Sequence, residues 1–234
     1  MSISSGIRLT HFSLLGPYDQ GLYDEDGFFE GTNTIASNES IATYTNPEPR
    51  LGLNYKLGEY SSLKMSYASI YQYIQNIYNT STPLPTSRWK ISDSYILPQK
   101  NDTYGLGIYK NYPKTGIDFS VESYYRNTQN NLTYKPGANF FLSEFLEQEV
   151  TQAQGKSYGL EISLRKTTGK VNGFFNYTWS RSQLKTNEPL IKNRINNNNW
   201  FSSDFDRPHT VNASINFEGD AFNSFSFNFT GQTG

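Results

Sequence analysis

The chain alternates apolar and polar residues with period two over most of its length. In residues 155–180, apolar side chains occupy every second position on either side of a central Thr-Thr-Gly-Lys stretch. This alternation is typical of β-strands that have one apolar and one polar face. A two-residue turn at residues 168–169 would pair Leu160 with Tyr177 and bring both apolar faces to the same side. The segment therefore predicts a β-hairpin.

The same pattern recurs in three further hairpins, at residues 51–67, 104–121 and 211–229. The tight turns of the hairpins are about 54 residues apart, which indicates a repeated supersecondary unit. Together with an alternating run at residues 6–15, these hairpins predict about nine strands. The runs reach or slightly exceed the ~9–11 residues that a tilted strand needs to cross a bilayer.

Long polar segments connect the hairpins, at residues 17–47, 74–99, 131–149 and 184–205. They have the composition of loops, and only residues 140–150 could hold a turn or two of helix. If neighbouring strands are antiparallel, every tight turn lies at one end of the sheet and every long loop at the other. Soluble sandwiches have turns at both ends, whereas outer-membrane barrels have short turns on one side and long loops on the other.

Composition helps to decide whether the apolar strand faces meet a protein core or lipid. Hydrophobic residues make up only 35% of the chain, yet aromatic residues reach 16%. Too few apolar residues remain elsewhere to cover these faces, and the many Tyr and Trp side chains suit a membrane interface. We predict an all-β fold, an antiparallel transmembrane β-barrel segment of about nine strands that is open because bacterial barrels use even strand numbers.

The barrel prediction assigns individual residues of the hairpin at residues 155–180 to the membrane interface or to the lumen. The two-residue turn sets Tyr158 opposite Trp179 at the loop end, where an interfacial girdle of aromatic rings would lie. On the other face, Asn172, Asn176 and Thr178 would point toward a hydrated lumen. The alternative for Tyr158 and Trp179 is that the two rings pair across the strands of a soluble sheet.

Charge and residue types exclude several classes of function. The net charge is −1 and no basic patch occurs, so nucleic acid is not an expected partner. The chain has no cysteine, and its two histidines are far apart in the sequence; we expect no catalytic site, metal site or cofactor. The first residues lack a signal-peptide pattern and no run approaches the ~18 apolar residues of a spanning helix. Any crossing would use strands, and any export signal would lie outside this chain.

Aromatic residues in the long loops are candidates for ligand binding. Trp89 follows Arg88 in one polar loop, and Trp200 and Phe201 follow the amide side chain of Asn198 in another. Large rings beside basic and amide groups suit stacking on a sugar or an aromatic chelate, with the amides as hydrogen-bond partners. The alternative is that these rings pack the loops against one another.

Three segments resemble the barrel of TonB-dependent outer-membrane receptors: residues 48–75, 155–182 and 204–217, in this order and with a long loop before the third. The third contains the stretch Asp206-Arg207-Pro208-His209, which in that family marks the start of a strand. Its role is interpreted as structural. A proline at the first strand position costs no ladder hydrogen bond, and the neighbouring Asp and Arg can form an ion pair.

This resemblance implies an outer-membrane barrel of about 22 strands with a plugged lumen. Such receptors import scarce ligands such as metal chelates, vitamins or oligosaccharides, with energy from the TonB complex, which contacts a motif ahead of the plug domain. Residues 1–234 are then expected to be a partial barrel without plug or signal peptide, inserted in outer-membrane lipid and not competent for transport alone. The alternatives are a soluble or surface-attached β-rich binding module, and a small outer-membrane pore or adhesin.

Overall fold

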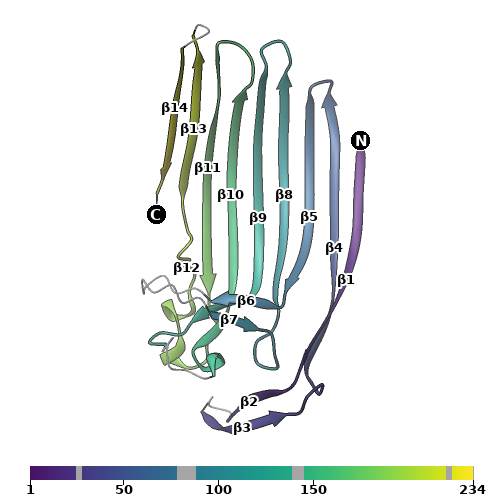
Figure 1. The fold of residues 1–234 in the computed structure, drawn as a ribbon, viewed down its shortest axis with the longest axis vertical. Coiled ribbons are helices and arrows are strands. Elements are labelled where there is room, and N and C mark those ends of the chain that lie inside the picture. Colours follow the sequence, from purple (N-terminus) through teal and green to yellow (C-terminus); the bar gives the residue numbers. More distant parts are fainter. Residues whose placement is uncertain (25–27, 78–87, 139–144, 220–222, 234) are drawn as a thin grey trace.

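Nine long strands form one antiparallel meander in the computed structural model, which describes residues 1–24, 28–77, 88–138, 145–219 and 223–233 (Figure 1). Each strand pairs with the next long strand along the chain, and the short β12 (Phe201–Ser202) adds to β11. The nine are β1 (Ser2–Leu15), β4 (Ser40–Gly58), β5 (Ser61–Gln72), β8 (Gln99–Tyr112), β9 (Ile117–Tyr134), β10 (Val150–Lys166), β11 (Val171–Lys185), β13 (His209–Glu218) and β14 (Ser224–Gln232). The predicted all-β antiparallel fold is confirmed.

Short turns and long connections lie at opposite ends of this sheet, as predicted. The turns that join the hairpins gather at the upper end in Figure 1, and the long connections at the lower end. The connections contain two small hairpins, β2 (Tyr18–Tyr23) with β3 (Phe29–Ile35) and β6 (Ile74–Ile77) with β7 (Arg88–Ile91). They also contain three 3-10 turns, η1 (Leu146–Gln148), η2 (Ile191–Asn193) and η3 (Asn196–Asn198). Residues 140–144 of the predicted helical turn lie outside the described residues.

The first long loop is shorter than predicted. Strand β4 begins at Ser40, inside the segment 17–47 that the sequence assigns to a loop, and it pairs with β1 up to Leu15. Pro47 and Pro49 lie within this stretch, where β4 is paired with β1 but no longer with β5, whose register begins at Arg50. Prolines are tolerated where a strand has a neighbour on one side only. Their presence therefore does not mark the end of the strand.

The β10–β11 hairpin has a wider turn than predicted. Leu160 lies opposite Trp179 and not Tyr177, so the register differs by two residues from that of the predicted turn at residues 168–169, and the pairing of the two strands ends at Lys166 and Gly173. The turn residues bond to the neighbouring β8–β9 turn instead of extending their own ladder: the N–H of Thr167 donates to the Gly116 carbonyl over 2.9 Å. Because the shift is even, every side chain keeps its predicted face.

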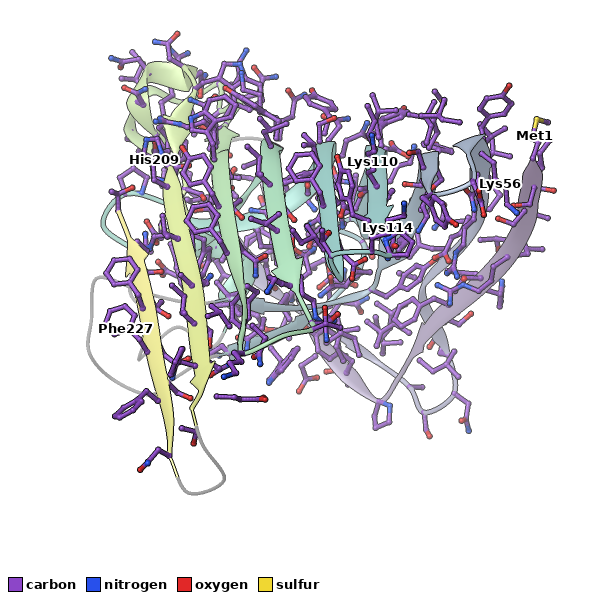
Figure 2. All side chains as sticks on the ribbon, turned by 90° about the horizontal axis from the view of Figure 1, so that it is seen from above. Met1, Lys56, Lys110, Lys114, His209 and Phe227 are labelled. Atoms are coloured by element: carbon purple, nitrogen blue, oxygen red, sulfur yellow. The ribbon has the colours of Figure 1, made fainter. Side chains whose placement is uncertain are left out.

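The apolar face of the sheet is continuous and is not covered by the described protein. The accessible surface of 14850 Å² far exceeds the roughly 11,000 Å² of a compact monomer of this mass. Figure 2 shows Met1 and Phe227 at opposite edges, and β1 and β14 are not paired with each other, so the sheet is open. The following side chains of this face are each at least 37% exposed: Ile7, Leu51, Met65, Leu106, Leu160, Phe175, Ile215 and Phe227.

A row of aromatic rings crosses five neighbouring strands on this apolar face. The ring centroids of Tyr67 and Tyr104 are 5.0 Å apart and those of Tyr104 and Tyr125 are 6.5 Å apart. Tyr125 lies opposite Tyr158, whose ring meets Trp179 edge-on at 5.9 Å. We call these five residues the aromatic belt. Of these five residues, the sequence identified only Tyr158 and Trp179. It placed them directly opposite each other, whereas they are diagonal neighbours in the structure, and diagonal neighbours are still close enough for their rings to contact.

The belt separates two kinds of outward side chain. Toward the turns the outward positions are mostly apolar, and toward the loops they include Lys100, Asp102, Asn127 and Lys156. The stretch from the belt at Tyr158 to the turn spans about 20 Å for a tilted strand, close to the ~25 Å apolar band of membrane barrels. Among the described residues, no helix is long and apolar enough to span a membrane.

Replacing Ile162, midway along this band, by lysine is expected to destabilise the protein in lipid by about 2–4 kcal/mol, because a cation at mid-bilayer loses its hydration. The control is Thr178→Lys, which places the same cation on the polar face opposite Glu161 and should change stability little. Denaturant titration in lipid vesicles measures both. Equal losses from the two variants would contradict the assignment of the faces.

Candidate ligand-binding surface at the loop end

Amide and hydroxyl side chains bond to each other across the polar face of the sheet. The Ser163 hydroxyl donates to Asn176 Oδ1 over 2.7 Å, and Asn216 Nδ2 donates to Asn172 Oδ1 over 3.1 Å. These cross-strand bonds lie opposite the apolar face, because successive strand residues alternate between faces. Such a face suits the hydrated lumen that the sequence predicts for Asn172 and Asn176.

A cavity of about 290 Å³ opens on the polar face at its loop end. Its lining is dominated by amides and hydroxyls, with the guanidinium of Arg126, the carboxylate of Asp204 and the rings of Phe201 and Phe205. Its amide and hydroxyl members are Asn76, Gln99, Asn101, Thr128, Asn131, Thr133, Ser157, Ser182, Gln183 and Ser203. One cation and one anion leave the lining without net charge. Mixed donors and acceptors beside aromatic rings are typical of sites that orient a polar ligand.

Hydrogen bonds between strands and loop fix the wall of this cavity. Thr128 donates to Asn101 Oδ1 over 2.8 Å, and the hydroxyls of Ser157 and Ser182 are 3.2 Å apart. Ser203, from the loop after β11, donates to the Ser182 hydroxyl over 2.9 Å. The wall is therefore built partly on rigid strands, which hold a site more firmly than loops alone.

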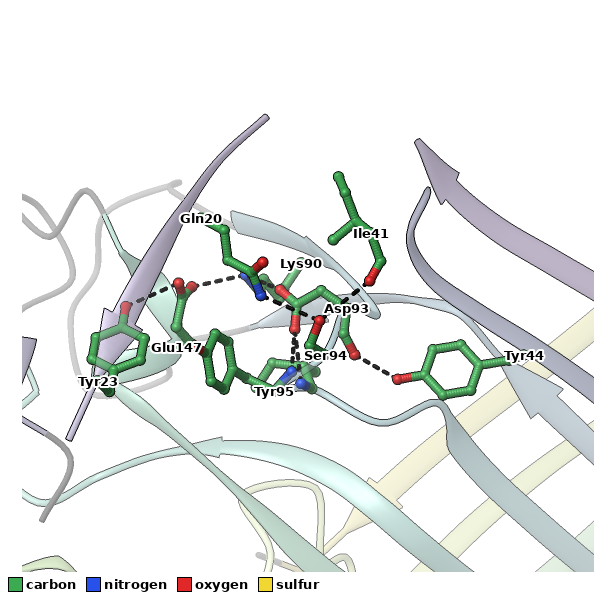
Figure 3. A network of polar contacts seen from close by, with 10 residues as sticks. Gln20, Tyr23, Ile41, Tyr44, Lys90, Asp93, Ser94, Tyr95 and Glu147 are labelled. Carbon is green, nitrogen blue, oxygen red and sulfur yellow. Dashed lines mark hydrogen bonds and ion pairs between the residues drawn. The ribbon is translucent and has the colours of Figure 1, made fainter. Parts of the chain in front are cut away.

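A buried charge cluster ties three connections together at this end (Figure 3). The Lys90 ammonium lies 2.8 Å from Asp93 Oδ2 and 2.8 Å from Glu147 Oε2, and the Tyr23 hydroxyl donates to Glu147 Oε1 over 3.0 Å. The Lys90, Asp93 and Glu147 side chains are only 8%, 3% and 5% exposed. We call these four residues the loop clamp. It joins the β2–β3 hairpin, the connection that carries β7 and the connection that carries η1.

Burial and charge act in opposite directions on Lys90. Burial alone would lower the pKa of Lys90, but Asp93 and Glu147 together outweigh it and raise that pKa. Burial, with the added effect of Glu147, raises the pKa of Tyr23. At neutral pH the lysine is therefore charged and the tyrosine is protonated, so each can donate its hydrogen bond.

The segment around the clamp also rests on β9. Asn130 has a left-handed φ of 58°. The Gln75 amide bonds to the backbone around it: Nε2 donates to the Asn130 carbonyl over 3.2 Å, and Oε1 accepts from Leu132 N–H over 3.1 Å. Beside it is a small apolar core of Ile77, Ile96, Leu146 and Val150. The buried hydrophobic residues of the described chain lie mainly here, at the loop end.

The structure separates the loop residues that the sequence groups as ligand candidates. Phe201 lines the cavity, whereas Trp200 lies with its ring 4.1 Å from the Lys156 ammonium. Trp89 is 65% exposed on β7, next to Arg88 and on the opposite side of that strand from buried Lys90. Only Phe201 of this group therefore lines the cavity, and a ligand-binding role for all of them stays a prediction.

Asn198 holds its own loop in shape. Its Oδ1 accepts from the Thr186 hydroxyl over 3.0 Å and from Glu188 N–H over 3.1 Å, while its Nδ2 donates to the Glu188 carbonyl over 2.9 Å. The residue has a left-handed φ of 60°, which asparagine tolerates better than most residues. Both ends of the Asn198 amide therefore form hydrogen bonds within the loop, whereas the sequence offers this amide as a candidate partner for a ligand.

The Asp206–His209 stretch anchors the start of β13 to β11. Strand β13 begins at His209, directly after Pro208, as the sequence indicates. Asp206 accepts the Ser182 N–H over 2.7 Å, and its ion-pair partner is Arg181 at 3.4 Å. The adjacent Arg207 instead donates to the Asp206 carbonyl over 3.0 Å. The predicted Asp206–Arg207 pair is thus replaced by a cross-strand pair, because the side chain of Asp206 turns toward β11.

His209 completes this anchor from the outward face. Its Nδ1 lies 2.9 Å from the Tyr177 hydroxyl, and the two rings are stacked with centroids 6.1 Å apart. Its backbone N–H donates to the Thr233 hydroxyl over 3.0 Å, which links β13 to the segment after β14. These partners belong to β11 and to the segment after β14, and a structural role for the Asp206–His209 stretch stays a prediction.

The clamp is the main feature that the sequence does not reveal. Lys90 and Glu147 are 57 residues apart and lie in segments without periodicity. The one local signal is that Lys90 stands between outward Trp89 and Ile91, at a position where an alternating strand turns inward.

An apolar outward band, an aromatic belt, a polar inner face and loops gathered at one end together define the wall of a transmembrane β-barrel. The sequence model of the TonB-dependent receptor-like β-barrel family matches residues 2–234, and the chain belongs to this family. Members of the family are outer-membrane proteins, and the chain is accordingly assigned to the outer membrane.

Solved structures have the same fold. The FrpB iron transporter from Neisseria meningitidis (F3-3 variant) is 12% identical, with a TM-score of 0.60 over 97% of this chain and 30% of that chain. The ferric-catecholate import receptor Fiu from K12 E. coli, in a closed form, is 14% identical, with a TM-score of 0.57 over 97% of this chain and 31% of that chain. The chain thus spans about 30% of the length of either receptor. No curated protein sequence matches it.

The variant Lys90→Met is expected to loosen the three clamped connections, because it leaves Asp93 and Glu147 buried without their cation. Removing one partner of a buried ion pair costs about 3–5 kcal/mol, which corresponds to amide exchange at least roughly 100-fold faster in a locally opening segment. Hydrogen exchange of residues 88–96 and 145–150 measures this effect.

Lys114→Met, in the exposed turn at the other end of the sheet, is the control for this variant. Because folding raises the pKa of Lys90, its contribution is complete below the unfolded-state pKa of about 10.4 and is lost only as the pH rises through the folded-state pKa. Protection that falls between pH 7 and 9, or that is unchanged in Lys90→Met, would contradict the clamp.

Proposed function

We propose that this chain forms one part of the wall and of the extracellular ligand surface of a receptor that imports a scarce ligand with TonB-supplied energy. The observation that carries the proposal is the polar cavity at the loop end, walled by β8–β11 and the loop that bears Phe201. The loop clamp supports it, because fixed connections pre-organise a binding surface and lower the entropy cost of binding. The chain acts as a receptor component and not as an enzyme.

A second cavity favours an anionic chelate with aromatic groups among the possible ligands. It measures about 450 Å³ and lies between the β2–β3 hairpin and the η1 and η2 connections. Phe28 and Phe29 line it together with two cations, Lys135 and Lys192, and one carboxylate, Glu149. The Lys192 ammonium is 5.1 Å from the Phe28 ring centroid. Rings and ammonium groups in one cavity suit a ferric catecholate, in line with the ligand named for Fiu. A vitamin or an oligosaccharide is the alternative ligand.

The two free sheet edges fit a larger barrel. Strands β1 and β14 each have one long-strand neighbour, so their outer backbone groups would be unsatisfied in lipid. We infer that further strands of the same receptor pair with both edges and that a plug domain closes the lumen. The TonB complex would act through that plug and not through residues 1–234.

Uptake by cells tests the proposal. Cells carrying the full receptor should accumulate a radiolabelled ferric catecholate, and loss of TonB should abolish uptake while surface binding persists. The Phe201→Ala variant should weaken binding at least about tenfold, because an aromatic ring that a ligand covers contributes one to a few kcal/mol. Phe227→Ala, which removes an outward ring on β14, should leave binding unchanged.

The other outcomes separate the alternatives. Uptake that is independent of TonB would indicate a pore, and a chain that stays monomeric in water without detergent would indicate a soluble binding module. Cobalamin and a malto-oligosaccharide, tested in parallel, show whether a vitamin or a sugar is the ligand. Trp200→Ala and Trp89→Ala show whether the exposed loop rings belong to the ligand surface.

A further inference from the structure

The inner, polar face of β11, β13 and β14 carries almost no charge. Between the aromatic belt and the turns, the described side chains that point inward from these three strands are amides and hydroxyls, apart from Phe174 and Glu218. Glu218 lies at the turn end, where its carboxylate accepts a hydrogen bond from the Asn172 amide over 3.2 Å. We call the even-numbered residues of 172–178, 210–216 and 224–232 the neutral strip; it runs along one edge of the sheet (Figure 1).

The inner face of the preceding strands is charged at the same level. The following side chains of β4, β5, β9 and β10 point inward between the belt and the turns and are ionisable: Lys56, Lys64, Asp118, Glu122, Glu161 and Arg165. Strand β8 lies among them and has no charge on this face, but the Lys64 ammonium lies over its Tyr109 ring, 4.2 Å from the centroid. The wall therefore divides at β11 into a charged part and an uncharged part.

The neutral strip begins at the polar cavity of the loop end. Ser182 of β11 lines this cavity, and Ser180 and Thr178 follow it on the same face of the strand toward the turns. On β10, by contrast, the inner face leads from Ser157 of the cavity to Glu161. A molecule that leaves the cavity toward the turns therefore meets an uncharged wall three strands wide along β11, β13 and β14.

An uncharged polar wall is suited to the passage of a polar solute. A fixed charge holds a solute of opposite charge and repels one of like charge, most strongly where water is partly excluded. Passage requires contacts that are favourable but weak, and amides and hydroxyls provide them because each can replace water as donor or acceptor. The strip is also held in shape: Asn216 donates to Asn172 Oδ1 over 3.1 Å and accepts from the Ser226 hydroxyl over 2.7 Å.

We propose that the neutral strip is the wall along which the imported ligand passes from the loop-end cavity to the turn end, which faces the periplasm in outer-membrane barrels. The strip does not select by the sign of a charge, so it accepts an anionic chelate and a neutral ligand alike. The inference rests on the proposed import function, and it adds a route to the binding surface.

Reversible blocking of single cysteines tests this route, in a chain that has no cysteine of its own. Asn212→Cys places a thiol on the neutral strip, and the matched control Ser120→Cys places one on the charged part of the wall. Both positions belong to one row of paired residues, Ser120–Ser163–Asn176–Asn212. Each variant of the full receptor, without other cysteines, is treated in TonB-containing cells with a bulky methanethiosulfonate. Uptake and surface binding of the radiolabelled ferric catecholate, cobalamin or malto-oligosaccharide, whichever the receptor imports, are measured before and after treatment, and mass spectrometry gives the extent of labelling.

Labelled Asn212→Cys should import at least about tenfold more slowly with unchanged surface binding, because the bulky group narrows the route, and a reductant that removes the group should restore uptake. Treated Ser120→Cys should import as it did before treatment. Equal loss in both variants, normal uptake by fully labelled Asn212→Cys, or failure of the reagent to reach that thiol overturns the route. Absence of TonB-dependent uptake before any treatment refutes the import function itself, whereas normal uptake before treatment followed by one of these results refutes the route alone.

Discussion

Pairing between neighbouring strands is the constraint on which the rest of this structure depends. Because side chains alternate strictly along a strand, one register assigns every residue of nine strands to either the apolar or the polar face. The same register brings five aromatic rings of separate strands to one level and sets Lys156 beside Gln183. Membrane insertion, the hydrated inner face and the cavity all follow from one set of backbone hydrogen bonds.

The sequence predicts the features that follow from its periodicity. It does not predict the features that depend on contacts between turns and loops far apart in the chain. Alternation and the spacing of turns were enough for the strand number, the faces and the segregation of turns from loops. The width of the β10–β11 turn was missed because Thr167 and Thr168 bond to Thr115 and Gly116 in another hairpin. Lys90 and Glu147 were missed because their segments lack periodicity, and Phe201 was separated from Trp200 only once β12 paired with β11.

The loop end combines two ways of holding a surface in place. Strands β8–β11 contribute side chains whose backbone is fixed on both sides, whereas the connections depend on buried charges and amides, such as Lys90 and Asn198. The buried ion pairs are satisfied by backbone and hydroxyl donors as well as by Lys90, so their desolvation is compensated. Buried charges and amides thus hold the conformation of the connections, and very few buried apolar side chains contribute to it.

The position of the aromatic belt also sets the height of the molecule above the membrane. Tyr158 is near the middle of β10, so the eight residues from Val150 up to the belt stand clear of the hydrocarbon. At about 3.3 Å per residue and with the usual tilt, this half of the strand forms a wall about 20 Å tall. The loop end of the sheet therefore presents a rigid, strand-built wall in water, beyond the surface of the bilayer.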